Sequence, residues 1–109
     1  MAISFKNKVV TGLGTSDTLL ISSDASTTIT IMGLSITNTT DNIIQVNVWL
    51  IDASSNTGYY LKNCIVTPNS SVRVVNGGER LVLTPSNSLH ASSNVAASAD
   101  IIVSYATQV

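Results

Sequence analysis

One histidine, one cysteine and six acidic residues are the side chains of this chain that could support acid–base, nucleophilic or metal chemistry. His90 lies in the segment Ser88-Leu89-His90-Ala91. A catalytic histidine needs a nucleophile and an orienting partner, and the local spacing supplies neither. Its alternation with Leu89 and Ala91 instead predicts an exposed histidine on the outer side of a strand.

Cys64 alternates with Lys62 and Val66, a setting that favours a small buried hydrophobic residue. The alternative is a reactive thiol, with Lys62 on the same side of the strand as its neighbouring base. A single cysteine cannot form an internal disulfide or a cysteine-based zinc cluster.

The acidic residues are scattered and lie mostly near expected turns, and none belongs to an Asp-x-Asp pattern that would indicate calcium. Two of them could meet across strands as a glycosidase pair, although only one is a glutamate. Gly12-Leu13-Gly14 is too short for a phosphate-binding loop and indicates a turn. We therefore expect no enzyme activity, no catalytic residue, no metal site and no cofactor. The six acids are Asp17, Asp24, Asp41, Asp52, Glu79 and Asp100.

The composition excludes several classes of partner. The 109 residues carry a formal net charge of −1, so no nucleic-acid footprint is present. No apolar run approaches the roughly 20 residues of a membrane helix. The first residues do not resemble a signal peptide, and we expect synthesis in a cytosol.

The charged fraction is 10%, against about 25% in an average soluble domain. Charges on edge strands are a main defence against edge-to-edge pairing. A charge-poor chain rich in strands could therefore hide its edges in an assembly. The alternative is that its many Ser, Thr and Asn side chains solvate the surface well enough.

The segment Ile43–Ala53 shows the clearest strand pattern. Its even positions form an apolar row at period two, which predicts one face on a core. Trp49, the only tryptophan, falls on the opposite face. The apolar row consists of Ile44, Val46, Val48 and Leu50.

Two hairpins are predicted around this strand. Apolar residues change parity at Gly33, so a β-bulge there would return both halves of segment 27–39 to the core. With that bulge, residues 27–53 form one long hairpin. Asn76-Gly77-Gly78 is the strongest hairpin-turn signal, because Asn and Gly tolerate positive φ.

Strands recur every ~8–14 residues with turn signals between them, and no segment has helical period. The pattern predicts a single all-β domain over residues 1–109, an antiparallel β-sandwich of about eight strands. Jelly-roll, immunoglobulin-like and barrel arrangements all fit.

Alternation places four apolar residues outward, and exposed Trp and aliphatic side chains are typical of a protein interface. The alternative is a sheet covered on both sides, with these side chains in an internal core. A third hypothesis is a carbohydrate-binding module in which Trp49, Tyr59 and Tyr60 stack on sugar rings. The candidate interface residues are Trp49, Ile51, Val75 and Val82.

Several segments share a pattern with a known family. They are Ala2-Ile3-Ser4-Phe5-Lys6-Asn7, the block from Tyr60-Leu61-Lys62-Asn63 to Pro68, Ser71–Gly78, Leu81-Val82-Leu83 and Asn87-Ser88-Leu89. In these segments the chain resembles small β-sandwich virion proteins of tailed bacteriophages.

This resemblance implies a non-enzymatic structural subunit of the virion, made in the host cytoplasm and present in many copies. A capsid decoration or cement protein is the first expectation, and a neck, collar or tail accessory protein is the alternative. The implied partners are copies of the chain itself and the major capsid, neck or tail proteins, with no nucleic acid and no membrane.

Overall fold

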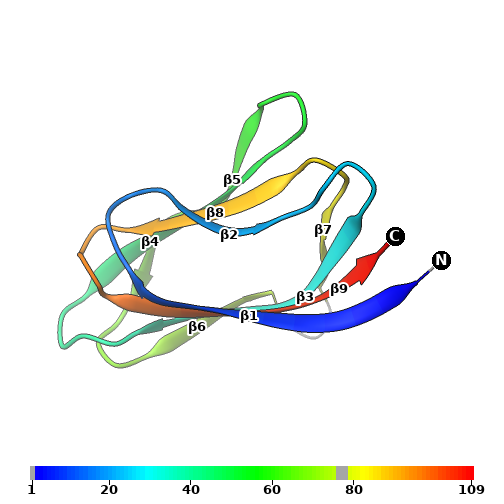
Figure 1. The fold of residues 1–109 in the computed structure, drawn as a ribbon. Helices are drawn as coiled ribbons and strands as arrows, with labels where there is room; N and C mark the ends of the chain where they lie inside the picture. The colour runs from blue at the N-terminus through cyan, green and yellow to red at the C-terminus, as the bar shows by residue number, and fades with distance from the viewer. Residues whose placement is uncertain (1, 76–78) are drawn as a thin grey trace.

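A computed structural model of the chain describes residues 2–75 and 79–109. In these residues it contains strands and no helix, so it holds no helix that could cross a membrane. The strands lie in two layers, and Ala2 and Val109 are joined by a backbone hydrogen bond, so the start of β1 and the end of β9 lie side by side (Figure 1). The strands are β1 (Ile3–Leu13), β2 (Thr18–Ser22), β3 (Thr28–Asn38), β4 (Ile44–Ile51), β5 (Thr57–Val66), β6 (Ser71–Val75), β7 (Leu81–Leu83), β8 (Ser88–Ser93) and β9 (Ala99–Gln108).

Both sheets are antiparallel, which confirms the predicted β-sandwich. Sheet A has the order β1-β9-β3-β6, with β7 also paired to β3, and sheet B has the order β2-β8-β4-β5. The pairing is nested along the chain: β1 with β9, β2 with β8, β3 with β6 and β7, and β4 with β5. A long ribbon of paired strands rolled over itself in this way is a jelly roll, which decides among the arrangements left open by the sequence.

The core lies between the two sheets and is built from one face of each. The apolar row of β4 points inward as predicted, with Ile44, Val46 and Val48 fully buried and Leu50 partly buried. From sheet A, Ile101 and Val103 of β9 meet this row with no exposed surface. Period-two alternation thus translates directly into a two-layer core.

The bulge predicted at Gly33 is confirmed. Ile31 pairs with Tyr105 and Gly33 pairs with Ser104, so Met32 is an extra residue on β3. The shift returns both the residues before it and those after it to the core, as the burial of Ile31 and Leu34 shows.

The predicted long hairpin over residues 27–53 is wrong. β3 belongs to sheet A and β4 to sheet B, so the segment between them crosses from one layer to the other. Each strand has its own mainly apolar face, and the two faces pack against each other across the core between the sheets. The hairpin at this place in the chain is β4–β5 instead.

The second predicted hairpin is also wrong in its flanking strands, although Asn76-Gly77-Gly78 itself lies outside the described residues. β6 and β7 both pair antiparallel with β3, at Leu34–Thr37 and at Ile29–Ile31. They therefore run in the same direction as two pieces of one interrupted strand and do not pair with each other.

The edge strands of both sheets carry features that oppose pairing with another chain. Four of the five Lys and Arg residues lie on edge strands: Lys6 and Lys8 on β1, Lys62 on β5 and Arg73 on β6. The fourth edge, β2, has five residues and a register shift against β8. Short, bulged or lysine-bearing edges resist pairing with another chain. Most of the positive charges of this chain thus lie where edge-to-edge association would otherwise begin.

Candidate functional site

The structure does not bring the four predicted interface residues together. Trp49 and Ile51 lie partly buried on the outer face of sheet B, whereas Val82 lies exposed on the outer face of sheet A. Val75 is a wrong prediction, because its side chain is 2% exposed in the core. Leu34 pairs with Val75 and the next residue, Ser35, pairs with Arg73. This shift inserts Val74 as an extra residue and reverses the side to which Val75 points.

A continuous row of rings crosses the outer face of sheet B. Trp49 is paired with His90 of β8 on one side and with Tyr59 of β5 on the other. The Trp49 and His90 rings are stacked, with centroids 5.8 Å apart and 10° between their planes. Tyr59 tilts against Trp49 at 5.8 Å, and the Lys62 amine lies 4.2 Å above the Tyr59 ring.

This row gives little support to the carbohydrate-binding hypothesis. A sugar stacks on the open face of an aromatic ring. Trp49 has neighbouring rings on both sides, and Lys62 covers Tyr59. Tyr60 has a different partner, since its hydroxyl donates a hydrogen bond to Glu79 Oε2 at 3.0 Å. Burial and this carboxylate raise the pKa of Tyr60 above its ordinary value.

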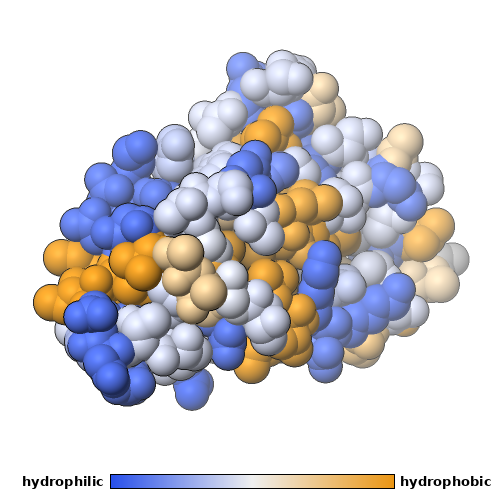
Figure 2. All heavy atoms as spheres, turned by 60° about the vertical axis from the view of Figure 1, so that its left-hand side comes forward, coloured by the Kyte–Doolittle hydropathy of each residue, from blue (hydrophilic) through white to orange (hydrophobic). Residues whose placement is uncertain are grey.

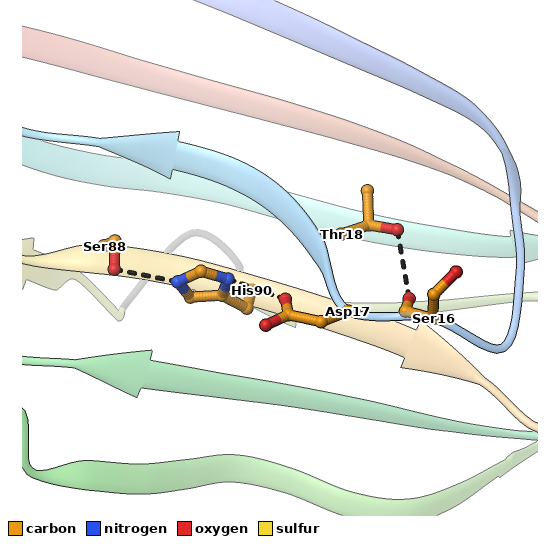
Figure 3. A network of polar contacts seen from close by, with 5 residues as sticks. All are labelled: Ser16, Asp17, Thr18, Ser88 and His90. Atoms are coloured by element: carbon orange, nitrogen blue, oxygen red, sulfur yellow. Dashed lines mark hydrogen bonds and ion pairs between the residues drawn. The ribbon is translucent and has the colours of Figure 1, made fainter.

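His90 has two polar partners that the sequence did not reveal. Its Nε2 lies 2.8 Å from Ser88 Oγ and its Nδ1 lies 2.8 Å from Asp17 Oδ1. Figure 3 shows the imidazole between the two side chains. Ser88 is two residues away on β8, and Asp17 comes from the β1–β2 connection, 73 positions away in the sequence. Only folding could place that carboxylate beside the ring.

The order of contacts, serine to Nε2 and carboxylate to Nδ1, is that of a hydrolase triad. The backbone of Ser88, by contrast, is engaged in the sheet. Ser88 pairs with Ser22 on one side and with Ile51 on the other, so its backbone faces neighbouring strands rather than a developing oxyanion. Asp17 is 59% exposed to solvent, and the His90 ring is covered by Trp49. The arrangement therefore ties the β1–β2 connection onto sheet B.

Replacing Asp17 by Ala should lower the free energy of unfolding by less than about 1 kcal/mol, because the Asp17 side chain is 59% exposed and solvent screens its contact with His90. Urea denaturation measures this change.

Hydrolysis of an activated ester by the unmodified protein should equal that of the His90→Ala variant. A rate that His90→Ala and Ser88→Ala both abolish would instead establish a hydrolytic centre.

Replacing Trp49 by Ala should cost about 2 kcal/mol of stability, below the ~3–5 kcal/mol typical of a buried tryptophan. The ring is only partly buried, but its loss removes two aromatic contacts. Thermal and urea unfolding test this value, with circular dichroism showing that the sheets remain. A loss above about 4 kcal/mol would make Trp49 a core residue after all.

The remaining chemical candidates stay separate. Cys64 is partly buried and free, and its sulfur lies near its own strand, 4.0 Å from the Ile65 carbonyl oxygen. Asp24 and Asp52 accept hydrogen bonds from turn N–H groups, which hold the pKa of each carboxyl below its ordinary value. Within residues 2–75 and 79–109, no three His, Cys, Asp or Glu side chains are grouped to hold a metal ion.

A set of exposed apolar side chains lies on the outer face of sheet A. Phe5 is opposite Ala106 and Val9 is opposite Ile102, so these strands turn apolar residues to the same side. Phe5 is 75% exposed. Thr30 is paired with both Ala106 and Val82, so the Val82 side chain points to the same side of sheet A as Phe5.

Among these, Val82 is an interface residue predicted from the sequence, whereas the β1 and β9 residues are not among the predicted ones. The alternation of β1 could have indicated them, since Ile3, Phe5 and Val9 share one parity. Figure 2 shows that hydrophobic residues reach the surface between hydrophilic ones over the side that it views. The exposed apolar residues of this face are Ile3, Phe5, Val9, Val82 and Ile102.

Comparisons with solved structures include a distant similarity. No protein-family model matches the chain, and no curated protein matches it. It is similar to a chain in the structure of infectious bursal disease virus Gx strain, with a TM-score of 0.43 and 11% sequence identity. The match covers 94% of this chain and 35% of the viral chain, so this chain spans about a third of the viral chain's length. At this level the similarity carries no inference about function.

Proposed function

We propose that this chain is a non-enzymatic structural subunit of a virion that joins its neighbours through the outer face of sheet A. The observation that carries the proposal is the group of exposed apolar side chains on that face, with Phe5 and Val9 prominent. Clusters of exposed apolar residues mark surfaces that a partner covers.

The features of the edge strands favour association through a face. Lys6, Lys8, Lys62 and Arg73 make edge-to-edge pairing with another sheet unfavourable. The outer face of sheet A is nearly free of charge: among its outward strand positions in the described residues, Arg73 and Asp100 are the charged ones. The free energy needed to desolvate a surface with few charges is small.

The sequence resemblance to tailed-phage virion proteins supplies the finer proposal. We infer a multicopy decoration or cement protein on the capsid, with a neck, collar or tail accessory protein as the alternative. Its partners would be copies of itself and the major capsid, neck or tail proteins. The site geometry agrees with a role that needs surfaces rather than catalytic groups.

The test is mass spectrometry and electron cryo-microscopy of virions purified from the phage whose genome encodes the chain. The expected result is density for the jelly roll at many symmetry-related positions on the particle. Purified virions that lack the chain would overturn the proposal. Density at the neck or tail alone would replace the decoration role by the accessory role.

A further inference from the structure

The outer face of sheet A is hollowed along β3. The cavity has a volume of about 430 Å³ and opens to solvent. Its lining includes Gly33, which has no side chain, and Ser104, whose Cβ would be 3.7 Å from a Cβ built on Gly33. The lining includes Met32, Gly33, Ser35, Arg73, Ile102 and Ser104.

Among residues 2–75 and 79–109, the most exposed large hydrophobic residue lies on the same face. Phe5 lies on β1, one strand away from Ser104 and two strands away from Gly33. At 75% exposure, its ring has little cover from its own chain. One face therefore carries both a projecting aromatic ring and an open hollow.

We propose that the hollow of each chain receives Phe5 of a second copy, so that two copies pack sheet A against sheet A as a symmetric dimer. The two-fold axis would lie in the plane of contact, midway between Phe5 and Gly33. A two-fold interface joins the same patch of both copies, so Phe5 of each copy enters the hollow of the other. This inference rests on the proposed structural role and names the first partner for the same face.

The size of the face fits such a dimer. Four strand positions at ~4.8 Å and ten residues at ~3.4 Å give roughly 650 Å² in projection. Side-chain relief makes the accessible area larger, near the ~800 Å² that each partner contributes to a standard interface. The molecule measures 45 × 27 × 21 Å, so one of its broad sides would be covered.

Pairing through the β1 edges is the less favourable way to join two copies. An antiparallel β1–β1 contact would place Lys6 and Lys8 of one copy beside the same lysines of the other. Like charges opposite each other across strands destabilise the pair. Packing through the outer face leaves these side chains on the inner side of β1, in solvent.

Cysteine cross-linking tests the predicted contact directly. Phe5→Cys and Ser104→Cys are made separately, each with Cys64→Ser, then mixed and mildly oxidised. A disulfide needs Cβ atoms about 3.8 Å apart, and the proposed packing brings position 5 of one copy next to position 104 of the other. The disulfide-linked dimer should therefore form about tenfold faster in the mixture than with either variant alone. The control mixture joins Leu19→Cys and Ile65→Cys, which are exposed on sheet B. Equal rates in the two mixtures would overturn the proposal.

Sedimentation then tests the insertion without cysteines. The unmodified protein should reach twice the 11.4 kDa chain mass as its concentration rises. Phe5→Asp and Ser104→Trp, which fills the hollow, should both remain monomeric with unchanged circular dichroism, whereas Ile65→Asp should still dimerise. A monomer at all concentrations, or a dimer that tolerates both variants, would refute the inference.

Binding to virions stripped of the chain separates this inference from the proposed function. If the protein binds particles as a monomer through the sheet A face, the structural role stands and the dimer is wrong. If the dimer forms through Phe5 and virions never contain the chain, the dimer stands and the virion role is wrong.

Discussion

The Val75→Asp variant should fail to fold, whereas Val82→Asp should unfold within about 0.5 kcal/mol of the unmodified protein. The two valines flank the same interrupted edge of sheet A and look alike in the sequence. Val75 is 2% exposed and Val82 is 47% exposed. An unpaired carboxylate at Val75 would sit among Leu34 and other core residues with no compensating partner.

A milder change at the same position keeps the test informative if Val75→Asp yields no soluble protein. Val75→Ala should lower the free energy of unfolding by about 2 kcal/mol, from lost burial of two carbon atoms and the cavity that remains. Val82→Ala should be nearly neutral. Urea denaturation of both alanine variants gives the comparison, and equal losses would show that the bulge at Val74 does not turn Val75 inward.

The Asn38→Ala variant should lose about 3 kcal/mol, the largest effect expected from a polar residue. Asn38 ends β3, and its side chain has no exposed surface. Its amide nitrogen donates to the carbonyl oxygens of Asn42 at 2.7 Å and Val66 at 3.0 Å. Its carbonyl oxygen accepts from the Thr40 N–H at 2.9 Å and the Thr40 hydroxyl at 2.7 Å.

These bonds hold the crossover from sheet A to sheet B and attach it to the end of β5. Without the Asn38 side chain, the Val66 carbonyl oxygen and the Thr40 N–H each lose a hydrogen-bond partner. Each such loss lowers the free energy of unfolding by about 1–3 kcal/mol. Asn42→Ala is the matched control, since Asn42 enters these contacts through its backbone alone. Equal unfolding midpoints for the two variants would show that the crossover is stable without the Asn38 side chain.

Much of the local structure could be predicted from the residue pattern. The inward row of β4 follows from alternation, because side chains of a strand point to opposite sides in turn. The bulge at Gly33 follows from a change of parity next to a glycine. The same reasoning failed at Val75, since the extra residue there is Val74, and no glycine or proline marks it.

Pairing between strands was less accessible. The sequence showed strands before and after Thr39-Thr40-Asp41-Asn42 but not that they enter different sheets. A polar turn of four residues suits a hairpin and a crossover equally well. The choice depends on how the apolar faces of all strands are buried together, and that sum is a property of the whole chain.

The candidate site divides in the same way. The row of His90, Trp49 and Tyr59 depends on which strands are neighbours in sheet B, and the Asp17 contact depends on where the β1–β2 connection crosses β8. The exposed apolar residues of β1 were visible in the sequence as alternation, but not as one face shared with β9 and β7.

The sequence by itself determined that this protein is an all-β sandwich with few charges, because alternation and turn residues act over neighbouring positions. The tertiary structure alone decided the jelly-roll pairing, the burial of Val75, the placing of Asp17 beside His90 and the hollow at Gly33 on the face of Phe5. Each of these joins residues far apart in the chain, and such contacts are fixed only when both sheets close on a common core.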